Sequence, residues 1–284
     1  MSFMSNDDVD RDARLSPRAR FAGRGVLVTG STGMGGSAAR ALAAEGAHVF
    51  VVARNPDHLT NLTADIEAAG GRCTTHSADL RDEEAVEDVF TAAIHVLPRL
   101  DAVYSVAGIS GRRFGDGPLH EATLEGWETV MGANATSQFL VVRAAVRRML
   151  SQTPDGNGSR GAILTMSSTL VAHPAPTFFA THGYAASKGA IDGLTRAAAA
   201  YYAPHGIRIN AIAPALVATP MSRRAQDDEA IRAYLADKQP LARGPIDVEA
   251  VTDVALHLLS DDARMLTGQV VIVDGGWTVS EPRR

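Results

Sequence analysis

Short apolar runs rich in β-branched residues alternate with longer helical stretches along most of this 284-residue chain. The runs are almost continuously apolar, which is typical of strands that are covered on both faces. Strands separated by helices form parallel sheets through right-handed crossovers. The expected strands cover residues 26–29, 48–53, 72–77, 102–106, 162–166, 207–212 and 270–273. The pattern therefore predicts an α/β fold, in which helices flank a doubly wound parallel sheet of about seven strands.

The expected helices follow the same rhythm. One starts after the first strand and runs to Glu45, and the others cover residues 56–69, 82–96, 127–150, 184–203 and 248–259. We find neither an internal repeat nor a linker-like stretch, so residues 21–284 are expected to form a single domain. Residues 1–20 are polar and carry mixed charge, which favours a flexible N-terminal extension over a strand-sized arm that packs on a neighbour.

Composition argues against several kinds of partner. The net charge is −5 and the basic residues are scattered, so neither nucleic acid nor an anionic membrane is expected. No apolar run approaches the ~20 residues that span a bilayer. Cys73 is the only cysteine, which excludes an internal disulfide and favours a cytoplasmic location. His173 and His182 lack further ligands at metal-binding spacing, so no metal site is expected.

A glycine-rich turn, TGSTGMGG at residues 29–36, follows the first expected strand. Between a strand and a helix, such a turn lets backbone N–H groups approach a pyrophosphate at the helix N-terminus. We therefore expect a Rossmann-like dinucleotide site, against the alternative of a purely structural turn. The expected contacts are Gly30, Ser31, Thr32, Gly33, Met34 and Gly35.

The end of the second expected strand bears on the choice of dinucleotide. An acidic residue there would bind the ribose 2′-hydroxyl of NAD. The chain instead has Arg54, whose guanidinium can bind a 2′-phosphate. NADP(H) is therefore preferred, and NAD(H) is the alternative if Arg54 is only an exposed residue at a strand end. Asp79 and Leu80, after the third expected strand, are placed to reach the adenine.

Tyr184 and Lys188 are four residues apart on an expected helix, so their side chains lie on the same face. A nearby cation favours the ionised form of a phenol, which brings proton transfer closer to neutral pH. Alone the pair is weak evidence, because a Tyr and a Lys at this spacing also occur on solvated helix faces.

These features resemble the short-chain dehydrogenase/reductase family, in particular its short single-domain branch, over about residues 25–277. The resemblance rests on segments that agree in order and spacing: 29–36, 133–135, 167–168, 184–188, 210–214 and 219–221. Residues 240–243 and 273–276 also look like family signatures.

The resemblance implies roles for four catalytic residues. Tyr184 would protonate the carbonyl oxygen as hydride arrives, and Lys188 would lower its pKa and bind the nicotinamide ribose. Ser168 would hold the substrate oxygen, with Ser167 as its rival. Asn134 would position a water that links Lys188 to solvent, or would instead only tie a helix to a strand. Further cofactor contacts are implied at Ala107, Gly108, Pro214, Val217 and Thr219.

Several positions depart from the family pattern. The glycines at positions 30, 33 and 36 have a spacing more typical of the epimerase-like branch. Val106 stands where relatives commonly carry Asn, which puts in doubt one hydrogen bond between the central strands. Ala215 replaces a common glycine after Pro214, and the stretch from Ser168 to Tyr184 is longer than usual.

The substrate pocket is expected between the loops 111–118, 173–183 and 217–239, the last of which resembles a mobile lid. Phe178 and Phe179 favour an apolar or aromatic substrate, or else they pack the longer loop. Arg112 and Arg113 could bind a carboxylate or phosphate, but a solvated pair is the favoured interpretation.

The sequence therefore predicts an NADP(H)-dependent carbonyl reductase or alcohol dehydrogenase that acts on a small-molecule carbonyl or secondary alcohol. The alternatives are a non-catalytic NADP-binding regulatory protein and a sugar-nucleotide epimerase-like enzyme. The resemblance also implies a homotetramer or homodimer. The Ala-rich face of residues 185–200 would permit close helix approach between copies, and would equally suit burial on the chain's own sheet.

Overall fold

The computed structural model describes residues 19–281. The predicted N-terminal extension over residues 1–20 therefore falls mostly outside the described residues. Arg20, which we had assigned to the extension, lies in the described part and donates to Glu45 Oε2 over 2.6 Å. The division of the chain into an extension and one domain stays a prediction.

The seven strands form one parallel sheet in the order β3-β2-β1-β4-β5-β6-β7. They are β1 Gly25–Thr29, β2 His48–Ala53, β3 Arg72–Ser77, β4 Ala102–Ser105, β5 Gly161–Met166, β6 Ile207–Pro214 and β7 Val270–Val273. Every residue of β1, β4 and β5 is buried, as the continuous apolar runs predict. This arrangement confirms the doubly wound, Rossmann-like sheet.

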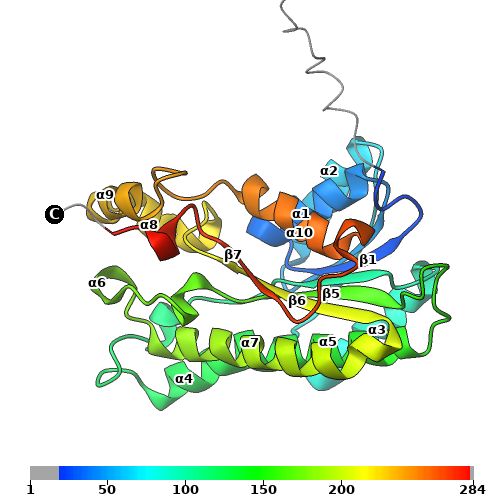
Figure 1. The fold of residues 1–284 in the computed structure, drawn as a ribbon, viewed down its shortest axis with the longest axis horizontal. Coiled ribbons are helices and arrows are strands. Elements are labelled where there is room, and N and C mark those ends of the chain that lie inside the picture. Colours follow the sequence, from blue (N-terminus) through cyan, green and yellow to red (C-terminus); the bar gives the residue numbers. More distant parts are fainter. Residues whose placement is uncertain (1–18, 282–284) are drawn as a thin grey trace, which may run out of the picture.

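Helices cover both faces of the sheet (Figure 1). On one face lie α1 Gly33–Ala44, α2 Pro56–Ala68 and α10 Val248–Leu259. On the other lie α3 Glu83–Val96, α4 Leu124–Val130, α5 Ser137–Leu150 and α7 His182–Tyr202. Each face has its own buried apolar cluster, so the sheet is the shared wall of two hydrophobic layers.

The structure differs from the expected helices in two ways. The helix expected over 127–150 is interrupted by a π-helical turn, Met131–Thr136, which joins α4 to α5. Three short helices were not expected: α6 Pro176–Phe179, α8 Arg223–Asp227 and α9 Glu229–Lys238. They lie in two of the three loops expected to form the substrate pocket, and they gather beyond one end of the sheet (Figure 1).

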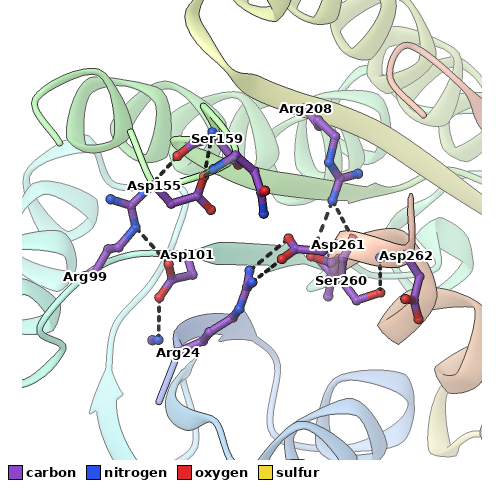
Figure 2. A network of polar contacts seen from close by, with 12 residues as sticks. Arg24, Arg99, Asp101, Asp155, Ser159, Arg208, Ser260, Asp261 and Asp262 are labelled. Atoms are coloured by element: carbon purple, nitrogen blue, oxygen red, sulfur yellow. Dashed lines mark hydrogen bonds and ion pairs between the residues drawn. The ribbon is translucent and has the colours of Figure 1, made fainter. Parts of the chain in front are cut away.

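The amino ends of the strands are tied together by polar contacts (Figure 2). Arg24, just before β1, forms a bidentate pair with Asp261, which follows α10. Arg99 donates to Asp101 at the start of β4 over 2.8 Å. Arg208 in β6 donates to main-chain carbonyls at the end of α10. The amino ends of the strands are thus occupied by structural contacts. In a parallel sheet of this kind, a ligand site usually lies at the carboxyl ends of the strands.

Candidate active site

Two connected cavities lie at the carboxyl ends of the strands. The larger has a volume of about 380 Å³ and follows the glycine turn toward β2 and β3. The smaller has a volume of about 180 Å³ and lies between β5, β6, the start of α7 and the segment with α8. They share six lining residues: Met34, Val106, Gly108, Ile109, Thr219 and Met221. The two cavities therefore form one cleft with an elongated and a compact part.

The glycine turn forms a backbone cradle for an anion. Gly30 and Gly33 have φ values of +98° and +53°, which side-chain-bearing residues rarely adopt. A Cβ on Gly35 would lie 2.3 Å from the Gly30 carbonyl oxygen, and one on Gly36 would lie 2.6 Å from that of Ser31. Helix α1 then begins with no side-chain cap and no acidic residue in its first turn. Its first N–H groups are available to a pyrophosphate, so the turn fits a dinucleotide.

The far end of the larger cavity is basic. Arg54 lines it as expected, and so does Arg81, which the sequence analysis missed. Asp79 and Leu80 also line this end, but Asp79 is paired with Arg81 at 2.5 Å. The hydrogen bond from Arg81 is the main cause that holds the pKa of Asp79 below its usual range. The Asp79 carboxylate is thus already engaged within the chain, and the two arginines make this end suitable for a phosphate.

Tyr184 and Lys188 both line the smaller cavity. Lys188 is 2% exposed, and its ammonium lies 5.6 Å from the centre of the Tyr184 ring and donates to the carbonyl of Met166, the last residue of β5, over 2.8 Å. Burial lowers the pKa of Lys188 from its ordinary 10.5 to about 7, and the charge of Asp192, one turn later, opposes this effect. Lys188 is therefore buried and Tyr184 half-buried, unlike a pair on a solvated helix face.

The pKa of Tyr184 differs from the sequence-based expectation. We expected Lys188 to make the phenol more acidic. In the structure, burial raises the pKa of Tyr184, and a hydrogen bond with Ser168 lowers it in part. Removing the phenolate from water outweighs the stabilisation that its neighbours provide.

The two candidate serines have different environments. Ser168 is 7% exposed, bonds the Tyr184 side chain and accepts from the Leu170 N–H over 3.3 Å. Ser167 is also buried and also lines the smaller cavity, but its hydroxyl has no hydrogen-bond partner among the described residues. The contact with Tyr184 favours Ser168, and Ser167 is left with a buried hydroxyl that has no partner in this part of the chain.

Asn134 lies in the π-helical turn, fully buried behind the cleft. Its Oδ1 accepts from Ile109 N–H over 2.8 Å, and its Nδ2 donates to Ile109 O and Ser187 Oγ, each over 3.1 Å. A Cβ on Gly108 would lie only 2.7 Å from Asn134 Oδ1. Asn134 thus has the structural role that was one of our two alternatives. Its side chain joins the π-helical turn to the segment after β4 and to α7. A water held by Asn134 stays a prediction.

Asp116 is a site residue that the sequence analysis missed. It is 6% exposed, and its two carboxylate oxygens accept from the backbone N–H groups of Gly183 and Tyr184 over 2.9 and 2.8 Å. Thr181, at the N-cap position of α7, makes no side-chain capping bond. A carboxylate from a distant loop therefore caps the helix that carries Tyr184. Its separation of 68 residues from Tyr184 left no local signal in the sequence.

The remaining predicted contacts also lie along the cleft. Ala107 lines the larger cavity, Pro214 and Val217 line the smaller, and Gly108 and Thr219 line both. Val106, the departure from the family pattern, lines both cavities as well.

The tie between β1 and the end of β4 is made by a threonine. Thr29 Oγ1 accepts from the N–H groups of Val106 and Ala107 over 2.9 and 3.0 Å. The central strands are thus joined without the side chain of an Asn at position 106.

The compact cavity has a mostly apolar wall. Phe179 and Trp277 line it, while Phe178 packs behind them against Tyr234 with ring centres 5.2 Å apart. Phe178 therefore packs the longer loop, as one of our two interpretations expected, and the apolar or aromatic substrate stays a prediction. Arg112 lines the cavity and Arg113 does not, so the two arginines are not equivalent.

Within residues 19–281, no group of three or more His, Cys, Asp or Glu side chains is arranged to hold a metal ion. No helix in this same part of the chain is long and apolar enough to cross a membrane.

Comparison with known proteins gives consistent matches over most of the chain. The family model described as enoyl-(acyl carrier protein) reductase matches residues 28–278. A gluconate 5-dehydrogenase from Gluconobacter oxydans is 35% identical over 263 residues, which cover 92% of this chain and 96% of the relative.

Solved structures agree with these matches. A short-chain type dehydrogenase/reductase from Mycobacterium ulcerans superposes with a TM-score of 0.83 at 30% identity, covering 92% of both chains. A Beutenbergia cavernae protein, assigned as an NAD(P) dependent gluconate 5-dehydrogenase and solved with NADP at low occupancy, superposes with a TM-score of 0.82 at 32% identity. That match covers 93% of this chain and all of the other.

Proposed function

The chain belongs to the short-chain dehydrogenase/reductase family of oxidoreductases, and from this premise we propose that it transfers hydride between NADP(H) and a carbonyl or secondary alcohol. The observation that carries the proposal is the position of Tyr184, Ser168 and Lys188. All three line the compact cavity, which shares six lining residues with the larger cavity that begins at the glycine turn.

The chain's own residues would manage the charge on one substrate oxygen. When bound, the nicotinamide cofactor supplies or accepts the hydride. Tyr184 would give a proton to the carbonyl oxygen, and Ser168 would donate a hydrogen bond to the same atom. Lys188, fixed to the Met166 carbonyl, would bring positive charge close to the phenol and favour its ionised form. Ser167 is a second donor of the same kind within this wall.

The preference for NADP(H) over NAD(H) rests on the basic end of the larger cavity. Arg54 and Arg81 line it, and Arg81 is partly neutralised by Asp79. Fluorescence titration with NADPH and NADH tests this point. We expect Arg54→Asp to weaken NADPH binding strongly and NADH binding little. An unchanged ratio of the two dissociation constants would show that Arg54 does not determine the preference for NADP(H).

Tyr184→Phe tests the catalytic assignment. We expect the variant to bind NADPH as the wild type does and to lose turnover with a panel of ketones, because only the proton-transferring hydroxyl is removed. Tyr201→Phe is the matched control, since Tyr201 lies on the same helix with 69% of its surface exposed. Full turnover by Tyr184→Phe would contradict the assignment. A wild type that binds NADPH but reduces no ketone would instead favour a regulatory NADP-binding protein.

Assembly as a homotetramer or homodimer and a cytoplasmic location stay predictions. The assembly prediction is supported by exposed side chains on the edge strand and on α7. Ile272 of β7 is 43% exposed, and Ala190, Ala197 and Ala200 face outward on α7 while Ala199 is buried. Analytical ultracentrifugation of the full chain would give the number of subunits.

A further inference from the structure

We propose that the compact cavity selects substrates with a carboxylate or phosphate group, and that Arg112 and Arg224 bind this anion at its mouth. The inference rests on the proposed function, because it assigns the substrate class of the same site. The anion would lie apart from the carbonyl or alcohol carbon, with an apolar spacer between them.

The two arginines come from different loops and converge on one cavity. Arg112 belongs to the segment after β4, and Arg224 belongs to α8 in the segment after β6. Both line the cavity that also contains Ser168 and Tyr184. Arg112 donates to the main-chain carbonyl of Phe178, which attaches its guanidinium to the wall of the cavity.

The charges of these arginines are not neutralised within the described part of the chain. Neither forms an ion pair with a carboxylate of residues 19–281. Asp116, the nearest acidic influence on Arg112, has both oxygens bound to the amino end of α7. Burial lowers the pKa of Arg112, and the positive charge of Arg224 lowers it further. Two like charges close enough to affect each other are stabilised by an anion placed between them.

The cavity that holds the arginines and the catalytic hydroxyls also has a large apolar part. Its wall includes Leu170, Phe179, Leu216, Ala225 and Trp277. These side chains favour an apolar spacer, because each buried methylene contributes about 0.8 kcal/mol. The cavity therefore fits a small amphipathic molecule with its reacting oxygen at Ser168 and Tyr184 and its negative group at the mouth.

Matched substrates test the proposal in the full-length enzyme with NADPH. The probes are linear methyl-ketone acids with spacers of increasing length, each compared with its own methyl ester, and methyl-ketone alkyl phosphates of the same lengths. We expect the wild type to prefer the best acid or phosphate over its uncharged counterpart by about tenfold or more in kcat/KM. The phosphate series shows whether a carboxylate or a phosphate is the better ligand.

Variants assign the preference to its residues. Arg224→Gln and Arg112→Gln are each expected to lower kcat/KM for the acid about tenfold or more, and to lower it much less for the ester. Arg223→Gln and Arg113→Gln are the matched controls, since each neighbours one of the two arginines and neither lines the cavity. Equal kcat/KM for acid and ester in the wild type, or the same loss in the controls, would overturn the proposal. An Arg224→Gln variant that loses NADPH affinity instead of acid preference would assign Arg224 to the cofactor and also overturn it.

A binding measurement separates this inference from the proposed function. If neither the acid nor the ester is reduced, the proposed function fails. Thermal unfolding in the presence of hexanoate or methyl hexanoate still tests the anion site, because it measures binding and needs no turnover. We then expect hexanoate alone to raise the Tm of the wild type, and not that of Arg224→Gln. Equal stabilisation of both proteins, or of neither, would refute the anion site.

Discussion

Replacing Asp116 by alanine should separate the positioning of Tyr184 from the binding of cofactor. The Asp116 carboxylate accepts two backbone N–H groups at the amino end of α7, one of them from Tyr184 itself. Alanine removes both acceptors and leaves the buried Gly183 N–H without a partner. We expect the first turn of α7 to fray or shift, and the phenol to lose its fixed distance to Ser168.

The magnitude follows from the contacts that are lost. A hydrogen bond to a charged group contributes about 1.5–3 kcal/mol, and a negative charge at a helix N-terminus contributes about 0.3–1 kcal/mol, or up to about 2 kcal/mol when partly buried. These contributions overlap, so we expect Asp116→Ala to lower the free energy of unfolding by about 2–4 kcal/mol. A displacement of the phenol of about 1 Å would lower kcat roughly tenfold to a hundredfold.

Urea denaturation, steady-state kinetics and NADPH titration together measure these effects. Asp82→Ala is the control, because Asp82 caps α3 through the N–H groups of Glu84 and Ala85, and none of the three lines the cleft. We expect it to cost stability without lowering kcat. If Asp116→Ala keeps full kcat, or loses NADPH affinity in proportion to kcat, the positioning argument is refuted. Asp116→Asn keeps one acceptor and should give an intermediate result if the alanine variant does not fold.

Two further predictions concern residues around Lys188. Burial lowers the pKa of Lys188 from 10.5 to about 7. Between pH 7 and 10.5 the lysine is therefore protonated in the unfolded state but neutral in the folded state. Below pH 7 it is protonated in both states, so the cost of burying the ammonium is greatest there. Lys188→Met should therefore be inactive yet more stable than the wild type near pH 6, with a gain that shrinks toward pH 10 in urea titrations; a constant difference would contradict the pKa. Gly108→Ala should strongly lower kcat because its Cβ would lie 2.7 Å from Asn134 Oδ1, whereas Gly193→Ala, with no atom within 4 Å of its Cβ, should keep full activity.

Much of the fold could be predicted because buried strands and helices have apolar patterns that can be recognised in the local sequence. The bounds of β2 agree with the expected range, since its apolar run ends where the chain leaves the sheet. Those of β3 and β7 agree as well, although none of their residues is fully buried. The π-helical turn within the expected helix 127–150 has no such local pattern. Its residues are compatible with an ordinary helix, and Asn134 within the turn makes its contacts with Ile109 and Ser187, which are far away in the sequence.

Candidate site residues were predictable where a motif held them, and not where the contact is long-range. The glycine turn, Ser168, Tyr184 and Lys188 all line the cleft that the sequence predicted. Arg81 could have been found by examining every basic residue just after a strand, as was done for Arg54. The direction of the Tyr184 pKa was not predictable from spacing, because the cost of burial depends on the whole surrounding wall.

The loop after β4 connects substrate recognition to the catalytic helix. Its Asp116 caps α7, its Gly117 carbonyl bonds His182 Nδ1 at 2.8 Å, and its Arg112 bonds the Phe178 carbonyl. These contacts join one short loop to the segment that ends at Tyr184. An anion bound by Arg112 would therefore stabilise the same loop that fixes the amino end of α7. If so, uncharged substrates should show a lower kcat as well as a higher KM, since binding energy at the mouth of the cavity would help to hold the phenol in place.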